Sequence, residues 1–383
     1  MSGPLDGVRI IEIAGLGAAP YGCMMLADMG ADVVRVERSG GGADTPARSP
    51  LLRNRRSVVL DLKRPEGVAA VMAMVSKADV IVEAFRPGVA ERLGIGPDAC
   101  LARNARIIYT RMTGWGQTGP LAQRAGHDLN YIALTGLLHQ IGPTGGKPVV
   151  PLNVIGDFGG GGLLMAFGVV CAVLEARRSG RGQVVDAAMV DGALSFMAMF
   201  FGYRDMGQFS DRTGSHLLGG GAHYYEVYET SDRKHLAVAP IEPQFYRVFV
   251  QKMGLDPDRY LPAGYPNQGR QVVEHDWPTL KDELAVIFKT RTRDEWMDLF
   301  ADDDTCVTPV LTLAEAAGHP QHRARQSFID VGGVEQQAPA PRFSRTPAAQ
   351  PLPPPEPGGD AAAVAADWDI DPWLLCRGLA EKL

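Results

Sequence analysis

The sequence predicts an α/β protein in which a large domain with a mostly parallel sheet is followed by a smaller α+β domain. Over residues 1–110, short apolar strands alternate with helical segments, which is typical of a parallel sheet covered on both faces. From about residue 224 the pattern changes to a hairpin followed by helices. A length of 383 residues is also too great for one compact core.

The elements of the large domain follow from the spacing of their apolar residues. Short apolar runs indicate buried strands, and apolar residues that recur every three or four positions indicate helices. In chain order these patterns predict strand 8–14, helix 20–29, strand 32–38, helix 66–77, strand 79–85, strand 106–112, helix 128–141, helix 160–178 and, within 180–189, a loop, a strand and the start of another helix. The segments 40–44 and 113–126 have the composition of loops.

The smaller domain is predicted over residues 225–325. Its elements are two strands joined by TSDRK, over 224–229 and 235–240, and helices over 243–253, 280–289 and 292–301. Residues 206–224 are predicted to link the two domains, and 326–360 to form a return linker. The part 336–360 is too rich in proline for a helix or a central strand, so it is predicted to be extended. A short helical tail is predicted over 367–383.

Composition narrows the class of protein. The formal net charge is -6, so there is no basic excess to neutralise a nucleic-acid backbone. The five cysteines are far apart and form no Cys-x-x-Cys pair, which argues against zinc and redox motifs and fits a reducing compartment. The start of the sequence lacks the pattern of a signal peptide, and the longest apolar run, 163–174, is too short to span a membrane. We therefore expect a cytoplasmic protein without a membrane span.

Basic side chains gather where the predicted strands end. Arg38 closes the second strand, and Arg86 follows the strand 79–85. Ligands of open α/β sheets bind at the carboxyl ends of the strands, and arginine suits phosphate groups. These positions favour a phosphorylated ligand over a set of solvated arginines. The other basic residues of this group are Arg53, Arg55, Arg56, Lys63 and Arg92.

The segment AGLGAAPYG, residues 14–22, partly matches a dinucleotide-binding fingerprint. It follows a strand and opens a helix, and Glu37 ends the next strand. However, Pro20 replaces the third glycine, which the fingerprint needs for close contact between helix and sheet. A tight turn between strand and helix is therefore the favoured interpretation, rather than a nicotinamide site.

His127 and Asp128 stand at the predicted start of a helix. The backbone N–H groups there have no helical partner and can bind an anion or a developing oxyanion. A histidine in this position is either a cap or a catalyst, and the residues alone leave both open. His139, further along the same segment, is predicted to be structural.

Asp157 lies in the stretch VIGDFGGGG, and its position before four glycines allows two interpretations. One interpretation is a helix N-cap, a role that aspartate favours. The other is an acid with room for a bulky ligand, because Gly156 and the glycines at 159–162 carry no side chains. No Gly-Lys-Ser/Thr closes the run and no Gly-x-Ser-x-Gly occurs, which argues against a phosphate loop and a serine hydrolase.

Glu242 follows a predicted strand, and Pro243 opens the next helix. It is either a first-turn acid near the helix dipole or a carboxylate that orients His127 across the domain boundary.

Taken together, these segments resemble the CoA-transferase family III and, within it, the α-methylacyl-CoA racemase branch. The similarity extends to about residue 345, and its motifs keep their order and spacing. The segments that carry it are DGVRIIEIAGLGAAPYGCMMLADMGADVVRVER, LRNRRSVVLDLK, RPGV, TRMTGWGQTGP, AGHDLNY, VIGDFGGG, GQVVDAAMVDG and PIEPQF.

The resemblance implies a doubly wound, Rossmann-like large domain that binds CoA, over residues 1–205 and 345–383. It implies an interlocked homodimer, with active sites between the large domain of one chain and the small domain of another. It also implies an acyl-CoA thioester as the substrate, with CoA as part of that substrate and no other cofactor required. Neither nucleic acid nor a membrane is implied as a partner.

The resemblance further implies the roles of individual residues. His127 and Asp157 would be the catalytic pair, and Glu242 would support His127. The residues implied to bind CoA or to line the thioester site are Arg38, Leu60, Lys63, Ala84, Phe85, Arg86, Arg92, Gly126, Asp128, Asn130 and Tyr131.

Two reactions fit this pair. A base on one face of the α-carbon and an acid on the other would invert a 2-methylacyl-CoA through an enolate. Alternatively, Asp157 would attack an acyl-CoA as a covalent nucleophile and transfer CoA between carboxylic acids. His127 together with Glu242 favours racemisation, because CoA transfer needs no second base.

Overall fold

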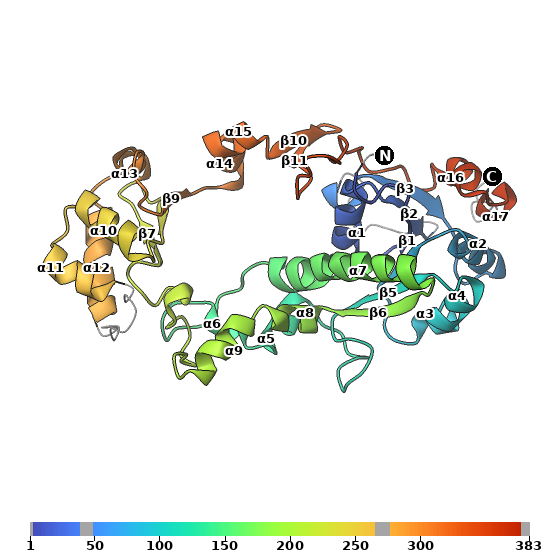
Figure 1. The fold of residues 1–383 in the computed structure, drawn as a ribbon, viewed down its shortest axis with the longest axis horizontal. Helices are drawn as coiled ribbons and strands as arrows, with labels where there is room; N and C mark the ends of the chain where they lie inside the picture. The colour runs from blue at the N-terminus through green and yellow to red at the C-terminus, as the bar shows by residue number, and fades with distance from the viewer. Residues whose placement is uncertain (1–2, 39–48, 265–275, 377–383) are drawn as a thin grey trace. The chain divides into compact units, whose positions relative to one another are not determined.

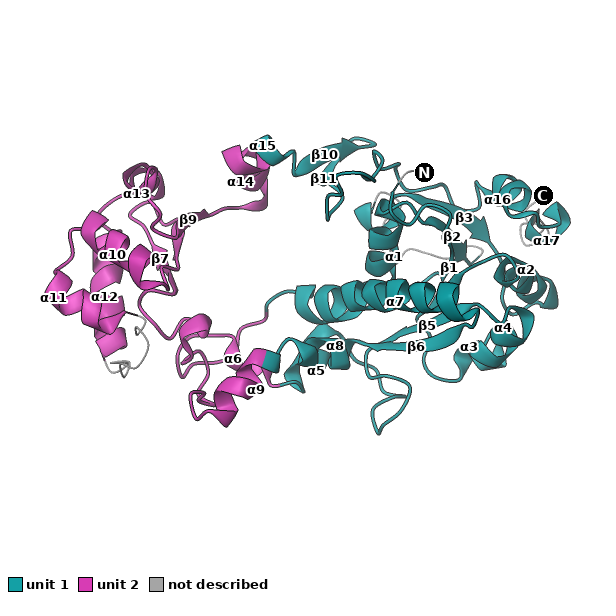
Figure 2. Ribbon diagram, in the orientation of Figure 1, with its two compact units in different colours: residues 1–135, 151–198, 323–383 teal, residues 136–150, 199–322 magenta. Residues whose placement is uncertain are grey.

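The computed structural model describes residues 3–38, 49–264 and 276–376 (Figure 1). The chain divides into two compact units, which Figure 2 shows in separate colours. The first unit comprises residues 1–135, 151–198 and 323–383, and the second comprises 136–150 and 199–322. The predicted loop 40–44 lies outside the described residues, as does the end of the predicted tail, 377–383.

A six-stranded parallel sheet forms the centre of the first unit, which confirms the predicted α/β fold. Its strand order is β3-β2-β1-β4-β5-β6, the order of a doubly wound nucleotide-binding fold. The strands are β1 (Arg9–Ile13), β2 (Asp32–Glu37), β3 (Arg55–Val59), β4 (Val80–Glu83), β5 (Ile108–Thr113) and β6 (Gln183–Ala188). The order reverses between β1 and β4, and ligands of such sheets bind beyond the carboxyl ends of the strands at this reversal.

Helices cover both faces of this sheet because successive side chains of each strand point in opposite directions. Ile10 of β1 packs in the core beneath α1 and α7, whereas Ile11 packs in the core beneath α2 and α16. The helices of the first unit are α1 (Ala18–Asp28), α2 (Pro65–Val75), α3 (Val89–Arg92), α4 (Pro97–Arg103), α5 (Asp128–Ala133), α7 (Leu164–Ser179), α8 (Met189–Ser195), α16 (Ala361–Trp368) and α17 (Pro372–Cys376), with the 3₁₀ turn η1 (Pro50–Leu52).

Several elements differ from the prediction. The strand β3 was not predicted, since its sequence RRSVV begins with two arginines. The predicted helix 128–141 is broken after α5, because Gly136 has a φ of 79° and starts a new turn. The tail forms two short helices, α16 and α17, and the first begins before residue 367.

The C-terminal connector has structure that the sequence did not predict. It begins with a hairpin of β10 (Phe328–Val331) and β11 (Val334–Gln337), and residues 338–355 form neither helix nor strand, as predicted for the proline-rich part. Asn54 accepts a hydrogen bond from the Leu352 amide at 2.7 Å. The Ser57 amide donates to the Asp360 carboxylate at 2.8 Å, and the Asp360 amide donates to the Ser57 carbonyl at 3.1 Å. The connector is therefore bound along the first unit beside β3.

A long apolar helix runs through the first unit. The continuous stretch Val154–Ser179 is 26 residues long and contains an 18-residue window with a mean hydropathy of 1.8, and among the described residues it is the one helix that could cross a membrane by length and composition. Its first part is the π-helix η2 (Val154–Leu163), and its second part is α7. Met165 and Val169 pack in the core with α1, so this face has the packing of a core helix.

The second unit contains the hairpin and the helices that the sequence predicted for residues 225–325. Its antiparallel sheet has the order β7-β8-β9 and packs against aromatic side chains of α10, α12 and α13. Its strands are β7 (Glu226–Glu229), β8 (His235–Val238) and β9 (Val307–Val310). Its helices, of which α9 and α15 extend past the limits of the unit, are α6 (Leu137–Gln140), α9 (Ala198–Asp205), η3 (Leu217–Gly219), α10 (Pro243–Lys252), α11 (Pro257–Tyr260), η4 (Leu261–Ala263), α12 (Trp277–Phe288), α13 (Arg293–Phe300), α14 (Leu313–Gly318) and α15 (Pro320–Arg325).

Candidate active site

A cleft of about 540 Å³ lies in the first unit at the carboxyl ends of β1, β4 and β5, where the strand order reverses. This is the position that a doubly wound sheet favours for a ligand. Both predicted catalytic residues of this unit, His127 and Asp157, line the cleft. The other lining residues are Gly15, Leu16, Gly17, Ala18, Ala84, Phe85, Arg86, Pro87, Met112, Thr113, Gly114, Trp115, Ala122, Arg124, Ala125, Gly126, Tyr131 and Met189.

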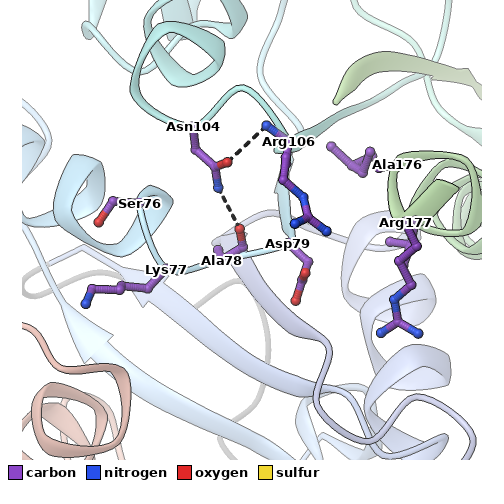
Figure 3. A pocket seen from close by; sticks show the side chains of 10 residues that line it. Ser76, Lys77, Ala78, Asp79, Asn104, Arg106, Ala176 and Arg177 are labelled. Carbon is purple, nitrogen blue, oxygen red and sulfur yellow. Dashed lines mark hydrogen bonds between the residues drawn. The ribbon is translucent and has the colours of Figure 1, made fainter. Parts of the chain in front are cut away.

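A second hollow, of about 120 Å³, lies near the amino ends of β4 and β5 (Figure 3). Asn104 closes one side of it, donating to the Ala78 carbonyl at 2.9 Å and accepting from the Arg106 amide at 3.0 Å. Arg177 contributes an exposed basic side chain, and Lys77 contributes a partly buried one that pairs with Asp369. The amino ends of parallel strands are not the usual ligand site, so the larger cleft is the candidate active site.

Asp157 is not a helix cap, and its backbone amide is bound by the carboxylate of Asp128. It is the fourth residue of η2, and the N-cap of that π-helix is Asn153, so the predicted N-cap role is wrong. The carboxylate of Asp128 accepts hydrogen bonds from the amides of Gly156 and Asp157 at 2.6 and 2.7 Å. Asn153 donates its side-chain amide to Asp157 Oδ2 at 3.0 Å. π-Helices are rare and often mark functional sites.

The glycines after Asp157 serve helix packing, which corrects the interpretation that they give a ligand room. A Cβ on Gly160 would lie 2.6 Å from the main-chain nitrogen of Ala193, and one on Gly162 would lie 2.5 Å from the carbonyl oxygen of Ala18. These two glycines therefore let η2 approach α8 and α1 at backbone distance.

The residue that leaves room beside the carboxylate is Gly17, the N-cap of α1. Its φ is 61°, and a Cβ there would lie 3.4 Å from Asp157 Oδ2. The segment 14–22, predicted to be a tight turn, is thus also a wall of the cleft. The partial glycine fingerprint was the signal that could have predicted this contact.

His127 is the N-cap of α5 and is exposed to the cleft. Its backbone amide donates to Asn130 Oδ1 at 3.0 Å, which fixes the start of the helix. Asn130 therefore supports the position of His127 at the start of the helix.

Burial raises the pKa of the Asp157 carboxyl above its usual range. The hydrogen bond from Asn153 and the charge of His127 lower this pKa, whereas the negative charge of Asp128 raises it further. His127 and Asp157 line the same cleft, so the structure brings the two predicted catalytic residues together. A carboxyl with a raised pKa is better matched to proton transfer near neutral pH.

Tyr131 and Asp128 shape the site from within. Tyr131 is buried, donates its hydroxyl to the Gly126 carbonyl, and packs edge-on against Trp115 with the ring centroids 4.8 Å apart. A Cβ on Gly114 would lie 2.1 Å from this tyrosine ring, so the loop after β5 must pass it with a glycine. The Asp128 side chain is buried against η2, so only its backbone can face a ligand.

The predicted CoA-binding residues follow the ends of neighbouring strands. Arg38 comes after β2, Lys63 after β3 and Arg86 after β4, and all three side chains are exposed. Since these strands are parallel members of one sheet, the three residues lie at the carboxyl ends of its strands. Arg92, at the end of α3, is also exposed. Leu60 differs, because its side chain is fully buried in the core and only its backbone is available to a ligand.

Three of the arginines from LRNRRSVVLDLK do not belong to a ligand site, which corrects their predicted grouping. Arg53 is fully buried and forms two hydrogen bonds with the carboxylate of Asp28 at 3.0 and 2.6 Å. Arg55 is buried against Glu12, with Nε 3.1 Å from its carboxylate. Arg56 pairs with Asp32 and Asp367. These three side chains join strands, helices and the C-terminal segment.

Glu242 belongs to the second unit, where it is the exposed N-cap of α10. Its predicted role beside His127 stays a prediction. His139 forms a hydrogen bond with the Asp211 carbonyl oxygen within the second unit, as expected of a structural histidine.

Comparison with known proteins decides the family. The profile of CoA-transferase family III matches residues 5–361. The chain belongs to this family. Among curated family III relatives, α-methylacyl-CoA racemase from Mus musculus is 44% identical over 345 residues, covering 90% of this chain and 87% of the relative. The racemase from Homo sapiens is 41% identical over 347 residues, with the same coverage of both chains.

Family III also contains transferases among the relatives of this chain. Acetyl-CoA:oxalate CoA-transferase from Acetobacter aceti is 30% identical over 349 residues and covers 87% of each chain. Among solved structures, a CaiB/BaiF family protein from Brucella suis has a TM-score of 0.82 and 26% identity, covering 96% of this chain and 100% of that one. The fold described above is therefore shared with this CaiB/BaiF family protein.

Proposed function

We propose that the protein racemises 2-methylacyl-CoA thioesters by moving the proton of the α-carbon. One observation carries the proposal: His127 and Asp157 line the same cleft from different segments, at the reversal of strand order. The identity of 41–44% to two α-methylacyl-CoA racemases supports this reaction over the others in family III.

The chemistry requires two groups that exchange protons at one carbon. The α-proton of a thioester is weakly acidic, so a base must remove it while the enolate oxygen is stabilised. His127 would act on one face and Asp157 on the other, and the roles would exchange with the configuration of the substrate. The raised pKa of the Asp157 carboxyl suits this exchange, because such a group can both hold and release a proton near neutrality.

The start of α5 would stabilise the enolate. The backbone N–H of Asp128 is at the first position of that helix, directly after His127. An N–H group there needs no helical partner and can donate to a developing oxyanion. The buried carboxylate of Asp128 would fix this N–H and the Asp157 backbone in one rigid unit.

CoA would be held by exposed basic residues at the carboxyl edge of the sheet. Arg38, Lys63, Arg86 and Arg92 supply four positive charges for its phosphates, and Phe85 and Arg86 also line the cleft. The thioester would then extend past Gly126 toward the catalytic pair.

The assembly would be an interlocked homodimer in which Glu242 of the small domain orients His127 of the large one. Two features of the first unit support a partner surface. Phe167 and Leu174 on α7 are largely exposed to solvent, and Leu194 of α8 and Phe196 at its end add to the exposed apolar surface. A carboxylate beside His127 would fix its tautomer and stabilise its charged form.

A deuterium experiment tests the reaction. A single enantiomer of a 2-methylacyl-CoA, incubated with the protein in D₂O, should gain deuterium at the α-carbon and approach an equal mixture of enantiomers. NMR of the α-position and chiral analysis of the released acid measure both changes. The reasoning is wrong if neither change occurs while CoA passes to an added carboxylic acid, which would indicate the transferase reaction with Asp157 as nucleophile.

Variants separate the roles of the residues. His127→Ala and Asp157→Asn should each abolish the exchange of the α-proton. His139→Ala is the matched control, because this histidine lies in the other unit and contacts a backbone carbonyl. An active His127→Ala protein would point to covalent chemistry at Asp157.

A further inference from the structure

A buried ionic cluster lies directly beneath the loop between β4 and α3. Glu83, the last residue of β4, is 2% exposed, and Arg111 of β5 is 7% exposed. The two residues are direct partners in the register of the parallel strands. Buried charges are costly unless they are paired, so this cluster indicates a specific requirement at this position.

Arg111 joins the strand to the helix that follows the loop. Its Nε lies 3.8 Å from Glu83 Oε1, and its Nη2 donates to Glu91 Oε1 on α3. Its Nη1 donates to the side chain of Gln117. The planar guanidinium thus contacts three side chains from β4, from α3 and from the loop after β5, which a lysine cannot do in the same geometry.

Glu83 holds the start of the loop through the backbone. Its Oε2 accepts the amide of Phe85 at 2.6 Å. Burial raises the pKa of Glu83 to about 7, and the Phe85 amide and Arg111 oppose this rise. The loop is also fixed in its middle, because Gln123 donates to the Pro87 carbonyl at 3.1 Å.

The loop held in this way carries ligand-facing residues. Phe85 and Arg86 line the candidate active-site cleft, and Arg92 directly follows Glu91 on α3. Arg111 itself lies outside the residues that line the cleft. Arg111 can therefore affect ligand binding only indirectly, through the segment from Phe85 to Arg92.

We infer that Arg111 is a positioning residue for CoA: by joining Glu83 to Glu91 it holds Phe85, Arg86 and Arg92 in their binding arrangement. The inference rests on the proposed function only in taking CoA as the ligand of this loop. It assigns Arg111 to binding of the CoA moiety and not to proton transfer.

Titration of the full-length protein with CoA itself tests this role. Arg111→Met should weaken CoA binding by about tenfold, which lies within the range that coupled contacts span. Arg111→Lys should fall between wild type and Met, because it restores the charge without the planar fork. The matched control is Arg106→Met, which removes the same charge from an exposed arginine near the amino ends of the strands.

Glu91→Gln tests the same link from the surface side, where its side chain is 45% exposed and a folding defect is not expected. Glu91→Gln should weaken CoA binding, and combining it with Arg111→Met should add little further, since both changes break one contact. Equal CoA affinity in wild type, Arg111→Met and Glu91→Gln would overturn the inference. So would strictly additive effects of the two changes.

Kinetics add a readout that a general loss of structure would not give. In the racemisation assay, Arg111→Met should raise KM for the acyl-CoA and leave kcat within about twofold. A fall in kcat with unchanged KM would overturn the inference. If wild type binds CoA but exchanges no α-proton, the proposed function fails while the CoA titrations still decide the role of Arg111. If wild type does not bind CoA, the role of Arg111 fails as well.

Discussion

Replacing Asp128 should loosen the segment that carries Asp157. The Asp128 carboxylate is 4% exposed and accepts two backbone amides at 2.6 and 2.7 Å. Asp128→Ala leaves two N–H groups without this acceptor, at about 1–3 kcal/mol each, so we expect a loss of about 2–6 kcal/mol. Asp128→Asn keeps an acceptor of the same shape without the charge and should cost about 1–3 kcal/mol.

Denaturant unfolding followed by fluorescence measures these losses, and a pH series of α-proton exchange supplies a second readout. The negative charge of Asp128 raises the pKa of Asp157, so Asp128→Asn should lower that pKa. The acid limb of the rate profile should then move to lower pH. An Asp128→Ala protein as stable as wild type would refute the reasoning, and so would an acid limb that moves to higher pH in Asp128→Asn.

Four further substitutions have defined outcomes. Asp157→Asn should abolish exchange yet raise the free energy of unfolding at pH 7. Because the pKa of Asp157 is raised in the folded state, the carboxyl stabilises the fold fully below the usual carboxyl range, and this contribution is lost as pH rises through the raised value. The gain of the variant over wild type should therefore shrink at pH 4. Arg53→Met should cost about 3–5 kcal/mol in urea unfolding, because it leaves the buried carboxylate of Asp28 without its cation; a loss below 1 kcal/mol would contradict this. Gly160→Ala should prevent folding to a soluble protein. Gly202→Ala should instead stabilise the protein by about 0.5–1 kcal/mol, because Gly202 lies in a helix and has open space where a Cβ would be. Equal expression and equal Tm of the two variants would contradict the packing argument.

The sequence predicted those parts of the fold that depend on local patterns. The alternation of apolar runs and helical periods lies within short windows, so the parallel sheet and most helices could be predicted. The strand β3 could not, because Arg55 and Arg56 at its start resemble a solvated loop. Their partners, Glu12 and Asp32, lie more than twenty residues away in the chain, and only the folded structure shows the pairing.

The same distinction applies to the candidate site. His127 and Asp157 could be identified from their motifs, and their presence in one cleft agrees with that identification. The role of the glycines could not be predicted, since the backbone that approaches Gly160 belongs to another helix. Asn153 was missed for a similar reason, because it acts through a contact with Asp157 rather than through a pattern of its own.

The position of α16 and α17 has a consequence for biosynthesis. Trp368 and Leu375, both fully buried, complete the core on one face of the first unit, although the strands they cover lie within the first 113 residues. A ribosome makes the chain from the N-terminus, so domains whose sequence is continuous can fold as they emerge. Here the part of this sheet face that α16 and α17 cover stays exposed until the second unit has been made and these helices have left the exit tunnel. We therefore expect the nascent chain to depend on chaperones through most of its synthesis, and stop codons placed just before α16 to yield aggregated protein.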